Sequence, residues 1–142
     1  MKSYVKIALF VVFLIALGGI LAALYLYNLK PEDLQKAKPH FTITAADFQK
    51  AFEDNEKTAS KKYINKIIEI SGEIASVKTG EKNSLNVSLK TGSELSSVIC
   101  TFHSVSDTTN IKPGNQIILR GVCSGFLMDV LLNNCAVIKI SK

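Results

Sequence analysis

An uncharged, apolar run near the N-terminus constrains this chain more than any other feature. Residues 7–27 read IALFVVFLIALGGILAALYLY and contain no charged side chain. A helix needs about 20 apolar residues to cross a bilayer. The alternative is a buried core helix, which is disfavoured because the run lies at the N-terminus and is apolar on every face. We therefore expect a single-pass transmembrane helix over residues 7–27, preceded by a short N-terminal tail at residues 1–6.

A cleaved signal peptide is the competing interpretation of the same run. Lys2 and Lys6 make a positive N-terminal region, and Gly18 and Gly19 are small enough to resemble a cleavage site. The apolar core of a signal peptide spans about 7–15 residues, whereas this run continues past Gly19 and ends in tyrosines, where an interfacial aromatic belt would lie. Ile20 stands where lipid attachment would require a cysteine. These features favour an uncleaved signal anchor.

The basic excess of the chain lies mainly beside this run. The net charge is +5, but residues 31–142 hold 14 Lys and Arg against 12 Asp and Glu, which leaves +2 there. Basic residues flank both ends of the run, so the positive-inside rule does not decide the orientation. A short N-terminal tail before a large C-terminal domain is the usual form of a signal anchor. We therefore expect a membrane protein with a periplasmic or otherwise extracytoplasmic domain.

A polar linker over residues 28–43, with two prolines, precedes a segment with helical patterning. Thr44 followed by Asp47 is close to a capping box at a helix N-terminus. Phe48 and Phe52 lie four residues apart, so they share one helical face that must be buried. A second short helix is expected over residues 56–63. Together they predict a helical lead-in over residues 44–63.

From residue 66 onward, apolar and polar residues alternate, which indicates β-strands. The alternating segments cover residues 66–74, 85–89, 98–102, 117–123 and 127–140. Gly72 predicts a bulge or bend in the first strand, and Ser124-Gly125 predicts the hairpin turn before the last. Residues 104–115 have little helical pattern, so we expect the helix that usually joins strands three and four of an OB-fold to be lost or reduced. The fold class is mainly β, a five-stranded OB-fold barrel within residues 44–142.

Three stretches of the sequence resemble the tRNA_anti-like group of OB-fold proteins: DNEKTASKKYINKIIEISGEI, VICTF and KPGNQIILRGVCSGFLMDVLLNNCAVI. The group is common in Bacteroidetes, and many of its members are described as lipoproteins. The resemblance covers about residues 44–140 and is most specific in GVCSGFLMDVLLNNC. It implies an OB barrel at the cell envelope but no particular activity, because the family name reflects a fold-level analogy. The missing lipid-attachment cysteine departs from the lipoprotein members and favours the transmembrane anchor.

The three cysteines leave two interpretations open. Cys100 and Cys135 fall on strands that are neighbours in an OB barrel, so a disulfide between them is one interpretation. In the other, all three cysteines, including Cys123, are buried free thiols that pack as small apolar residues. The chain has no CxxC motif, and His40 and His103 are poorly placed to complete a metal site. We therefore expect no metal and no other cofactor.

Candidate binding residues lie on the side of the barrel that OB-fold ligands usually contact. The loops at residues 78–83, 91–97 and 124–127 border this side. The candidates are Lys78, Lys82, Arg120, Phe126 and Asp129. Asp129 also has a structural interpretation, in which it accepts hydrogen bonds and closes the hairpin. No second carboxylate or base accompanies it, so we expect no enzymatic activity.

The ligand class follows from what the candidate surface lacks. Binding of single-stranded nucleic acid needs cationic groups along a groove and aromatic platforms for the bases. From residue 66 onward the chain offers two aromatic residues, Phe102 and Phe126. Phe102 alternates in step with Val98 and Cys100, so we expect it to point into the core. We therefore expect a membrane-anchored binding or interaction module of the cell envelope, with a protein or glycan ligand. A nucleic-acid-binding OB domain that faces the cytoplasm is the alternative.

Overall fold

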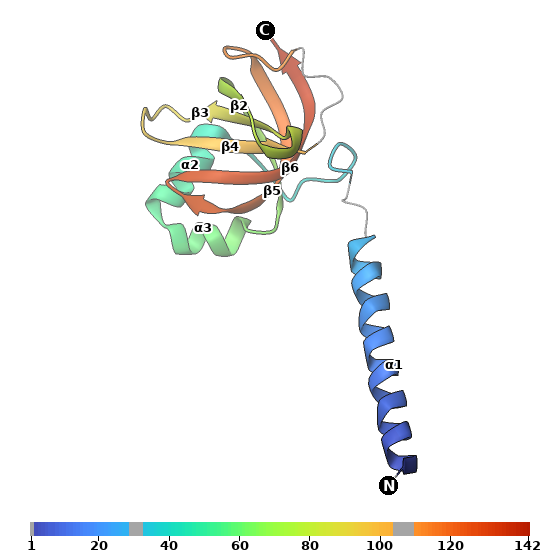
Figure 1. Cartoon of the computed structure of the whole chain (residues 1–142). Coiled ribbons are helices and arrows are strands. Elements are labelled where there is room, and N and C mark those ends of the chain that lie inside the picture. The colour runs from blue at the N-terminus through green and yellow to red at the C-terminus, as the bar shows by residue number, and fades with distance from the viewer. Residues whose placement is uncertain (1, 29–32, 104–109) are drawn as a thin grey trace. The chain divides into compact units, whose positions relative to one another are not determined.

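The structure, a computed structural model, describes residues 2–28, 33–103 and 110–142 (Figure 1). The chain divides into two compact units, Met1–Glu32 and Asp33–Lys142. Parts of two predictions, the linker over 28–43 and the connection over 104–115, fall on residues 29–32 and 104–109 and lie outside the described residues.

The first unit contains α1, which spans Lys2–Tyr27 and has no buried residue. From Ile7 onward the helix is apolar on every face, so its length and apolarity suffice to cross a membrane. This confirms a helix of membrane-spanning length. The helix begins at Lys2, so it also takes in most of the stretch predicted as a tail.

The second unit is built on a closed, five-stranded barrel of mixed strand pairing. Within the barrel, each strand pairs with two of the other barrel strands, in the cyclic order β2-β3-β4-β6-β5 and back to β2. The β4–β6 pair is parallel and the other four pairs are antiparallel. This confirms the predicted OB-fold. The strands are β2 (Ile67–Thr79), β3 (Leu85–Lys90), β4 (Ser97–Phe102), β5 (Gln116–Leu127) and β6 (Asp129–Ser141).

The long strand β2 closes the barrel by pairing with different neighbours along its length. Its residues 67–73 pair with β5, and its residues 74–79 pair with β3. The register shifts between Ile74 and Ser76, so the bulge lies beyond the predicted position at Gly72. Gly72 serves close packing instead, because a Cβ there would lie 3.0 Å from the Cβ of Ala45.

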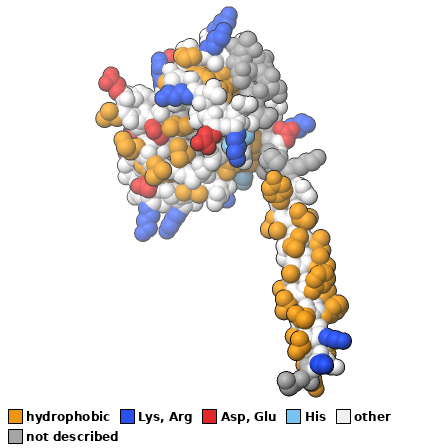
Figure 2. Space-filling view, viewed as in Figure 1, with side chains coloured by type: hydrophobic (Ala, Val, Ile, Leu, Met, Phe, Trp, Pro, Cys, Tyr) orange, Lys and Arg blue, Asp and Glu red, His pale blue; other side chains and the backbone are white. Residues whose placement is uncertain are grey.

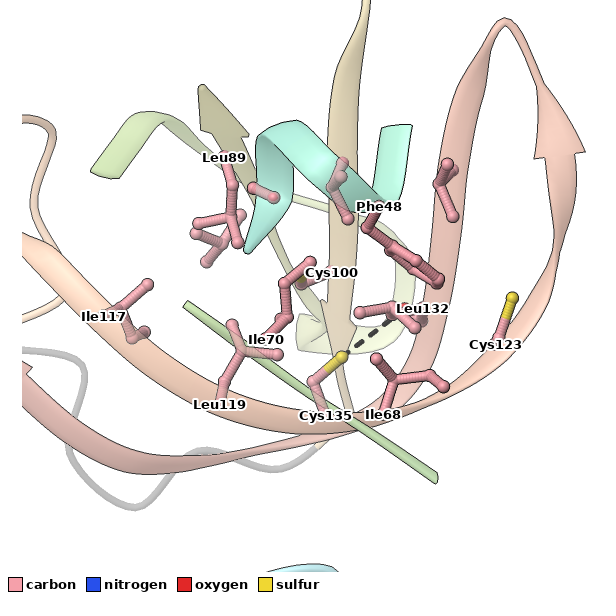
Figure 3. Packing of buried hydrophobic residues seen from close by; sticks show 14 of the residues in the cluster. Phe48, Ile68, Ile70, Leu89, Cys100, Ile117, Leu119, Cys123, Leu132 and Cys135 are labelled. Carbon is pink, nitrogen blue, oxygen red and sulfur yellow. Dashed lines mark hydrogen bonds between the residues drawn. The ribbon is translucent and has the colours of Figure 1, made fainter. Parts of the chain in front are cut away.

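The barrel interior is filled by the inward residues of all five strands (Figure 3). The alternating burial along β3 and β4 confirms the period of two read from the sequence. Phe102 is 1% exposed and belongs to this core, as predicted.

A pair of helices, α2 (Ala45–Asp54) and α3 (Glu56–Tyr63), packs against the barrel (Figure 1). Thr44 caps α2, accepting a hydrogen bond from the Asp47 amide at 3.2 Å, as the capping pattern predicted. Phe48 and Phe52 are both buried. Because α2 contacts four strands of the barrel, it acts as a plug for one end.

Residues 33–43, which the sequence assigned to the linker, are packed on the barrel. Strand β1 (Phe41–Thr44) pairs in parallel with β2. Leu34 and Ala37 are buried against Ile67 in a small second cluster. The compact unit therefore begins at Asp33 rather than at residue 44.

The hairpin between β5 and β6 turns later than the sequence predicted. Strand β5 continues through Ser124 and Gly125 to Leu127, and Leu127 pairs with Asp129. Met128 alone makes the turn, with φ of 69°. Ser124 lies at a register shift instead, so the small residues mark a bulge rather than a turn.

The crossing of β5 and β6 leaves no room for a side chain at Gly121. A Cβ there would lie 2.6 Å from the Cys135 sulfur and 3.1 Å from the Leu132 Cβ. We expect Gly121→Ala to lower the free energy of unfolding by about 1–3 kcal/mol through overpacking, measured by denaturant unfolding. Adding Cys135→Ala should recover part of the loss, because it removes the atom that lies closest. A double variant less stable than Gly121→Ala alone would contradict this packing.

Candidate binding surface

The outer face of β3 and β4 is the part of the barrel that most resembles a ligand surface. We define this outer face by six outward side chains in three cross-strand pairs: Asn86 with Thr101, Ser88 with Ile99, and Lys90 with Ser97. Five of the six are half-buried, and Lys90 is exposed. Strands β3 and β4 correspond to strands 2 and 3 of an OB-fold, whose face usually carries the ligand.

The neighbouring strands extend the outer face on both sides. Ser76 of β2 pairs with Ser88, and Lys78 pairs with Asn86. On the other side, Leu131 of β6 pairs with Ile99. The surface therefore consists of hydroxyl and amide groups around two aliphatic side chains, Ile99 and Leu131. Lys78 and Lys90 lie at its margin.

The aromatic residues of the second unit all lie elsewhere. Five of them form one cluster between the helices and the barrel, with ring centroids 5.1 to 6.0 Å apart. The sixth, Phe102, is in the barrel core. The outer face consequently offers no aromatic platform for a base. The clustered residues are Phe41, Phe48, Phe52, Tyr63 and Phe126.

Two of the predicted binding residues are open to solvent beside the outer face. Lys78 is exposed near the end of β2, and Lys82 is exposed in the 3-10 turn Glu81–Asn83 that follows. Both lie in the hairpin that joins β2 to β3, which is one of the loops that border an OB ligand site. They are the predicted candidates that remain available to a ligand.

Arg120, by contrast, is engaged within the protein on a different wall of the barrel. Its Nε donates to Glu69 Oε2 at 2.7 Å, and its Nη1 donates to the carbonyl oxygens of Gln35 and Ala37 at 3.0 and 2.8 Å. The ion pair is largely shielded, with side-chain exposures of 18% and 21%. Arg120 therefore clamps the segment at residues 35–37 to the wall made by β2 and β5.

Phe126 and Asp129 are also engaged in the fold. The ring of Phe126 stacks on Phe52 at 5.3 Å. Asp129 Oδ1 accepts from the backbone amide of Ser97 at 2.6 Å and from its hydroxyl at 3.0 Å. This matches the structural interpretation of Asp129, except that the bonded amide belongs to β4 and not to the hairpin turn. The structure thus does not bring the five candidates together in one site.

Sequence reasoning missed Gln49, the one buried polar side chain among the described residues. Its Nε2 donates to the Met128 carbonyl at 2.7 Å, and its Oε1 accepts from the Val130 amide at 3.3 Å. An amide side chain satisfied in this way fixes the tip of the β5–β6 hairpin to α2. In the sequence, Gln49 follows the buried Phe48 directly, which is a weak sign of burial. Glutamine on an amphipathic helix usually faces solvent, so the sequence did not predict its role.

All three cysteines are buried free thiols in the structure. The Cys135 thiol is close enough to Cys100 to influence its pKa, and it donates to the Leu132 carbonyl at 3.5 Å (Figure 3). Burial, with Cys135 beside it, holds the pKa of Cys100 well above its usual value. Burial also raises the pKa of Cys123 from 9.0 to about 11, against a smaller lowering by the Gly125 amide. The disulfide between Cys100 and Cys135 stays a prediction.

Among the described residues, no three His, Cys, Asp or Glu side chains are placed to hold a metal ion. His40, an exposed residue, accepts a hydrogen bond at Nδ1 from the Ile67 amide at 3.2 Å. This contact fixes the start of β1 against β2.

Comparison with known proteins identifies similar sequences and folds. The sequence model of the tRNA_anti-like family matches residues 1–137. A Klebsiella pneumoniae lipoprotein whose name suggests nucleic-acid binding has a similar crystal structure, with a TM-score of 0.60 and 20% identity, covering 78% of this chain and 100% of that one. The S. pombe Stn1–Ten1 complex has a TM-score of 0.39 and 20% identity, over 53% of this chain and 56% of that one. No curated protein matches.

The Arg120 clamp predicts a specific loss of stability. Arg120→Lys keeps the charge but cannot serve one carboxylate and two carbonyls with a rigid fork of donors. We expect the free energy of unfolding to fall by about 1–2 kcal/mol, with faster hydrogen exchange at the Ala37 amide. Lys139→Ala, an exposed change on β6, is the control and should stay within about 0.5 kcal/mol of wild type. Equal stability of Arg120→Lys and wild type would exclude the clamp.

The buried thiols predict a loss of stability at alkaline pH. The folded protein keeps Cys100 and Cys123 protonated, whereas unfolding frees thiols that ionise above their ordinary pKa of 9.0. Stability should therefore be intact below about pH 9 and fall as pH rises toward 11, measured by urea unfolding. Cys123→Ala should show a shallower fall. A thiol reagent at pH 8 should modify none of the three cysteines in the native protein and all three in guanidinium.

Proposed function

This chain is a member of the tRNA_anti-like family, and on that premise we propose that its OB-fold barrel is a binding module of the cell envelope, anchored in a membrane by α1. The ligand is a protein or a glycan, held on the outer face of β3 and β4 and by the loops that border it. The module has no enzymatic activity of its own.

The position of the aromatic residues is the observation that carries this proposal. Every aromatic ring of the second unit is packed in the barrel core or in the cluster around α2. Recognition of single-stranded nucleic acid relies on exposed rings that stack on bases, each stack contributing about 1–3 kcal/mol. Hydroxyl and amide groups around Ile99 and Leu131 instead suit hydrogen bonding and apolar contact with a protein or a glycan.

The contact of residues 33–37 with β2, β5 and β6 also supports the outer face of β3 and β4 as the ligand surface. The segment at residues 33–37 covers part of β2, β5 and β6 through Leu34, Ala37 and the carbonyls bound to Arg120. Strands β3 and β4 lie across the barrel from this contact (Figure 1). The N-terminal segment of the unit therefore leaves the outer face open.

Nucleic-acid binding is the second candidate function. It is favoured by the exposed Lys78 and Lys82 beside the outer face and by the name of the similar Klebsiella lipoprotein. Against it, the excess positive charge of the second unit is small, and its aromatic rings pack in the core or in the cluster around α2 rather than on the outer face. A likeness at 20% identity carries the fold and not the ligand.

A topology measurement tests the proposal. Alkaline phosphatase and a fluorescent protein would each be fused separately to Lys142 of the full chain, in a bacterial host. We expect phosphatase activity without fluorescence, because a signal anchor with a short N-terminal tail places the domain outside the cytoplasm. Processing of the chain after Gly19, seen by mass spectrometry of the membrane fraction, would contradict the anchor.

Fluorescence without phosphatase activity would contradict the envelope location and favour the second candidate. Labelled oligo(dT) and oligo(A) RNA would then be titrated against the full chain in detergent at several salt concentrations. Tight binding that weakens steeply with salt, and that is lost in Lys78→Ala/Lys82→Ala but kept in Lys139→Ala, would establish nucleic acid as the ligand. We expect at most weak, non-specific binding in all three proteins.

A further inference from the structure

Three large hydrophobic side chains stand in solvent at one edge of the barrel. Leu95, Leu127 and Met128 are 86%, 79% and 72% exposed, the highest values among the large hydrophobic side chains that the structure describes in the second unit. Leu95 lies in the loop between β3 and β4, and the other two form the tip of the β5–β6 hairpin. Figure 2 shows hydrophobic side chains over these loops. We call Leu95, Leu127 and Met128 the tip surface.

Hydrogen bonds hold the two loops of the tip surface together. Asp129 Oδ1 binds the amide and the hydroxyl of Ser97. Glu53 Oε1 accepts from the Ser96 hydroxyl and from Gln49 Nε2, both at 3.0 Å. Gln49 Nε2 also donates to the Met128 carbonyl. The residues that follow Leu95 and the backbone at Met128 and Asp129 are therefore tied to α2 and to each other by hydrogen bonds, while the apolar side chains stay exposed.

The turn residue is unfavourable for the backbone that it adopts. Met128 has φ of 69°, a region that glycine and asparagine occupy at lower energetic cost. The sequence thus places a long apolar side chain at an exposed turn where its backbone is strained. Strain that is tolerated at an exposed position is a reason to look for a role of the side chain.

Carboxylates border the tip surface. A groove of about 390 Å³ runs between α2 and residues 91–93, and its lining includes Asp47, Glu53 and Asp54 against the single cation Lys50. Glu94 precedes Leu95 in the adjoining loop. Within the described part of the chain, none of these four carboxylates lies within 4.0 Å of a Lys or Arg nitrogen. Their negative charge is consequently not neutralised by a salt bridge.

We propose that the tip surface docks a segment of a partner protein that carries apolar side chains next to Lys or Arg. The apolar side chains would contact Leu95, Leu127 and Met128, and a cationic side chain would enter the groove beside Glu53 and Asp54. The same carboxylates repel an anionic lipid surface, so charge complementarity favours a cationic protein segment as the occupant. The inference rests on the proposed function in taking the ligand to be a protein.

The chain contains no tryptophan, so the fluorescence of a single introduced tryptophan reports on its surroundings alone. Leu95→Trp in the full chain, held in neutral phosphatidylcholine nanodiscs, places one indole in the tip surface. The probes are synthetic peptides of three kinds: Leu with Lys and Arg, Leu with Asp and Glu, and Ser with Lys and Arg. We expect a saturable blue shift of the emission with the first kind, and at least a roughly tenfold weaker response with the others, because apolar and charge contacts are both required.

Second-site variants separate docking from folding. Met128→Gly suits the positive φ, so the domain should fold at least as stably as before, yet bind the Leu-Lys-Arg peptides roughly fivefold more weakly or worse, because apolar contact area is lost. Ile138→Ser is the matched control, because Ile138 is 37% exposed on β6 outside the tip surface, and it should bind as the parent does. Glu94→Lys with Asp54→Lys should transfer the preference to the Leu-Asp-Glu peptides.

Several outcomes would overturn the proposal. Equal binding by Met128→Gly and the parent would exclude the tip surface as the docking site, even if the topology fusion supports the proposed function. Quenching of the introduced indole of the Leu95→Trp variant by brominated lipid, without peptide, would make the surface a membrane contact. A blue shift that depends on protein concentration alone would make it an interface between two copies of the chain.

Discussion

The fold depends on the pairing of one long strand with two different neighbours. The first half of β2 pairs with β5 and the second half with β3, so β2 must bend where one partner gives way to the other. The register shift after Ile74 supplies that bend. Because the barrel closes through β2, the positions of β3, β4 and the loops beside them follow from this strand.

The open end of such a barrel would expose its apolar core, and α2 covers it. Phe48 and Phe52 enter the core, while Gln49 on the same helix satisfies its amide with backbone groups of the β5–β6 hairpin. One helix thus excludes water from the barrel and fixes the hairpin tip. This division of roles gathers the aromatic rings around α2 and in the core and leaves Leu127 and Met128 exposed, whereas a base-stacking surface requires exposed rings.

The two sides of the barrel differ in what they offer a partner. On the wall of β2 and β5, Arg120 and Glu69 are occupied with each other and with the segment at residues 35–37. The outer face of β3 and β4 keeps short polar side chains around Ile99 and Leu131, and it continues at Ser97 and Asp129 toward the tip surface. The polar and apolar areas are adjacent, as in a typical protein interface with an apolar centre and a polar rim.

The sequence by itself determined the membrane-spanning length of α1, the cap and buried face of α2, and the five strands of the barrel. These features are visible in short stretches of the sequence. Thr44 and Asp47 form a local helix cap, and the spacing of Val98, Cys100 and Phe102 at every second residue indicates a strand. The sequence did not determine which polar residues are engaged. Arg120 and Asp129 were plausible ligand groups until the fold brought Ala37 and Ser97 to them, from residues 83 and 32 positions away. The turn at Met128 and the packing of residues 33–44 were likewise decided by tertiary structure, because hydrogen bonds between distant segments outweighed the turn preference of Ser124-Gly125 and the linker-like composition before β1.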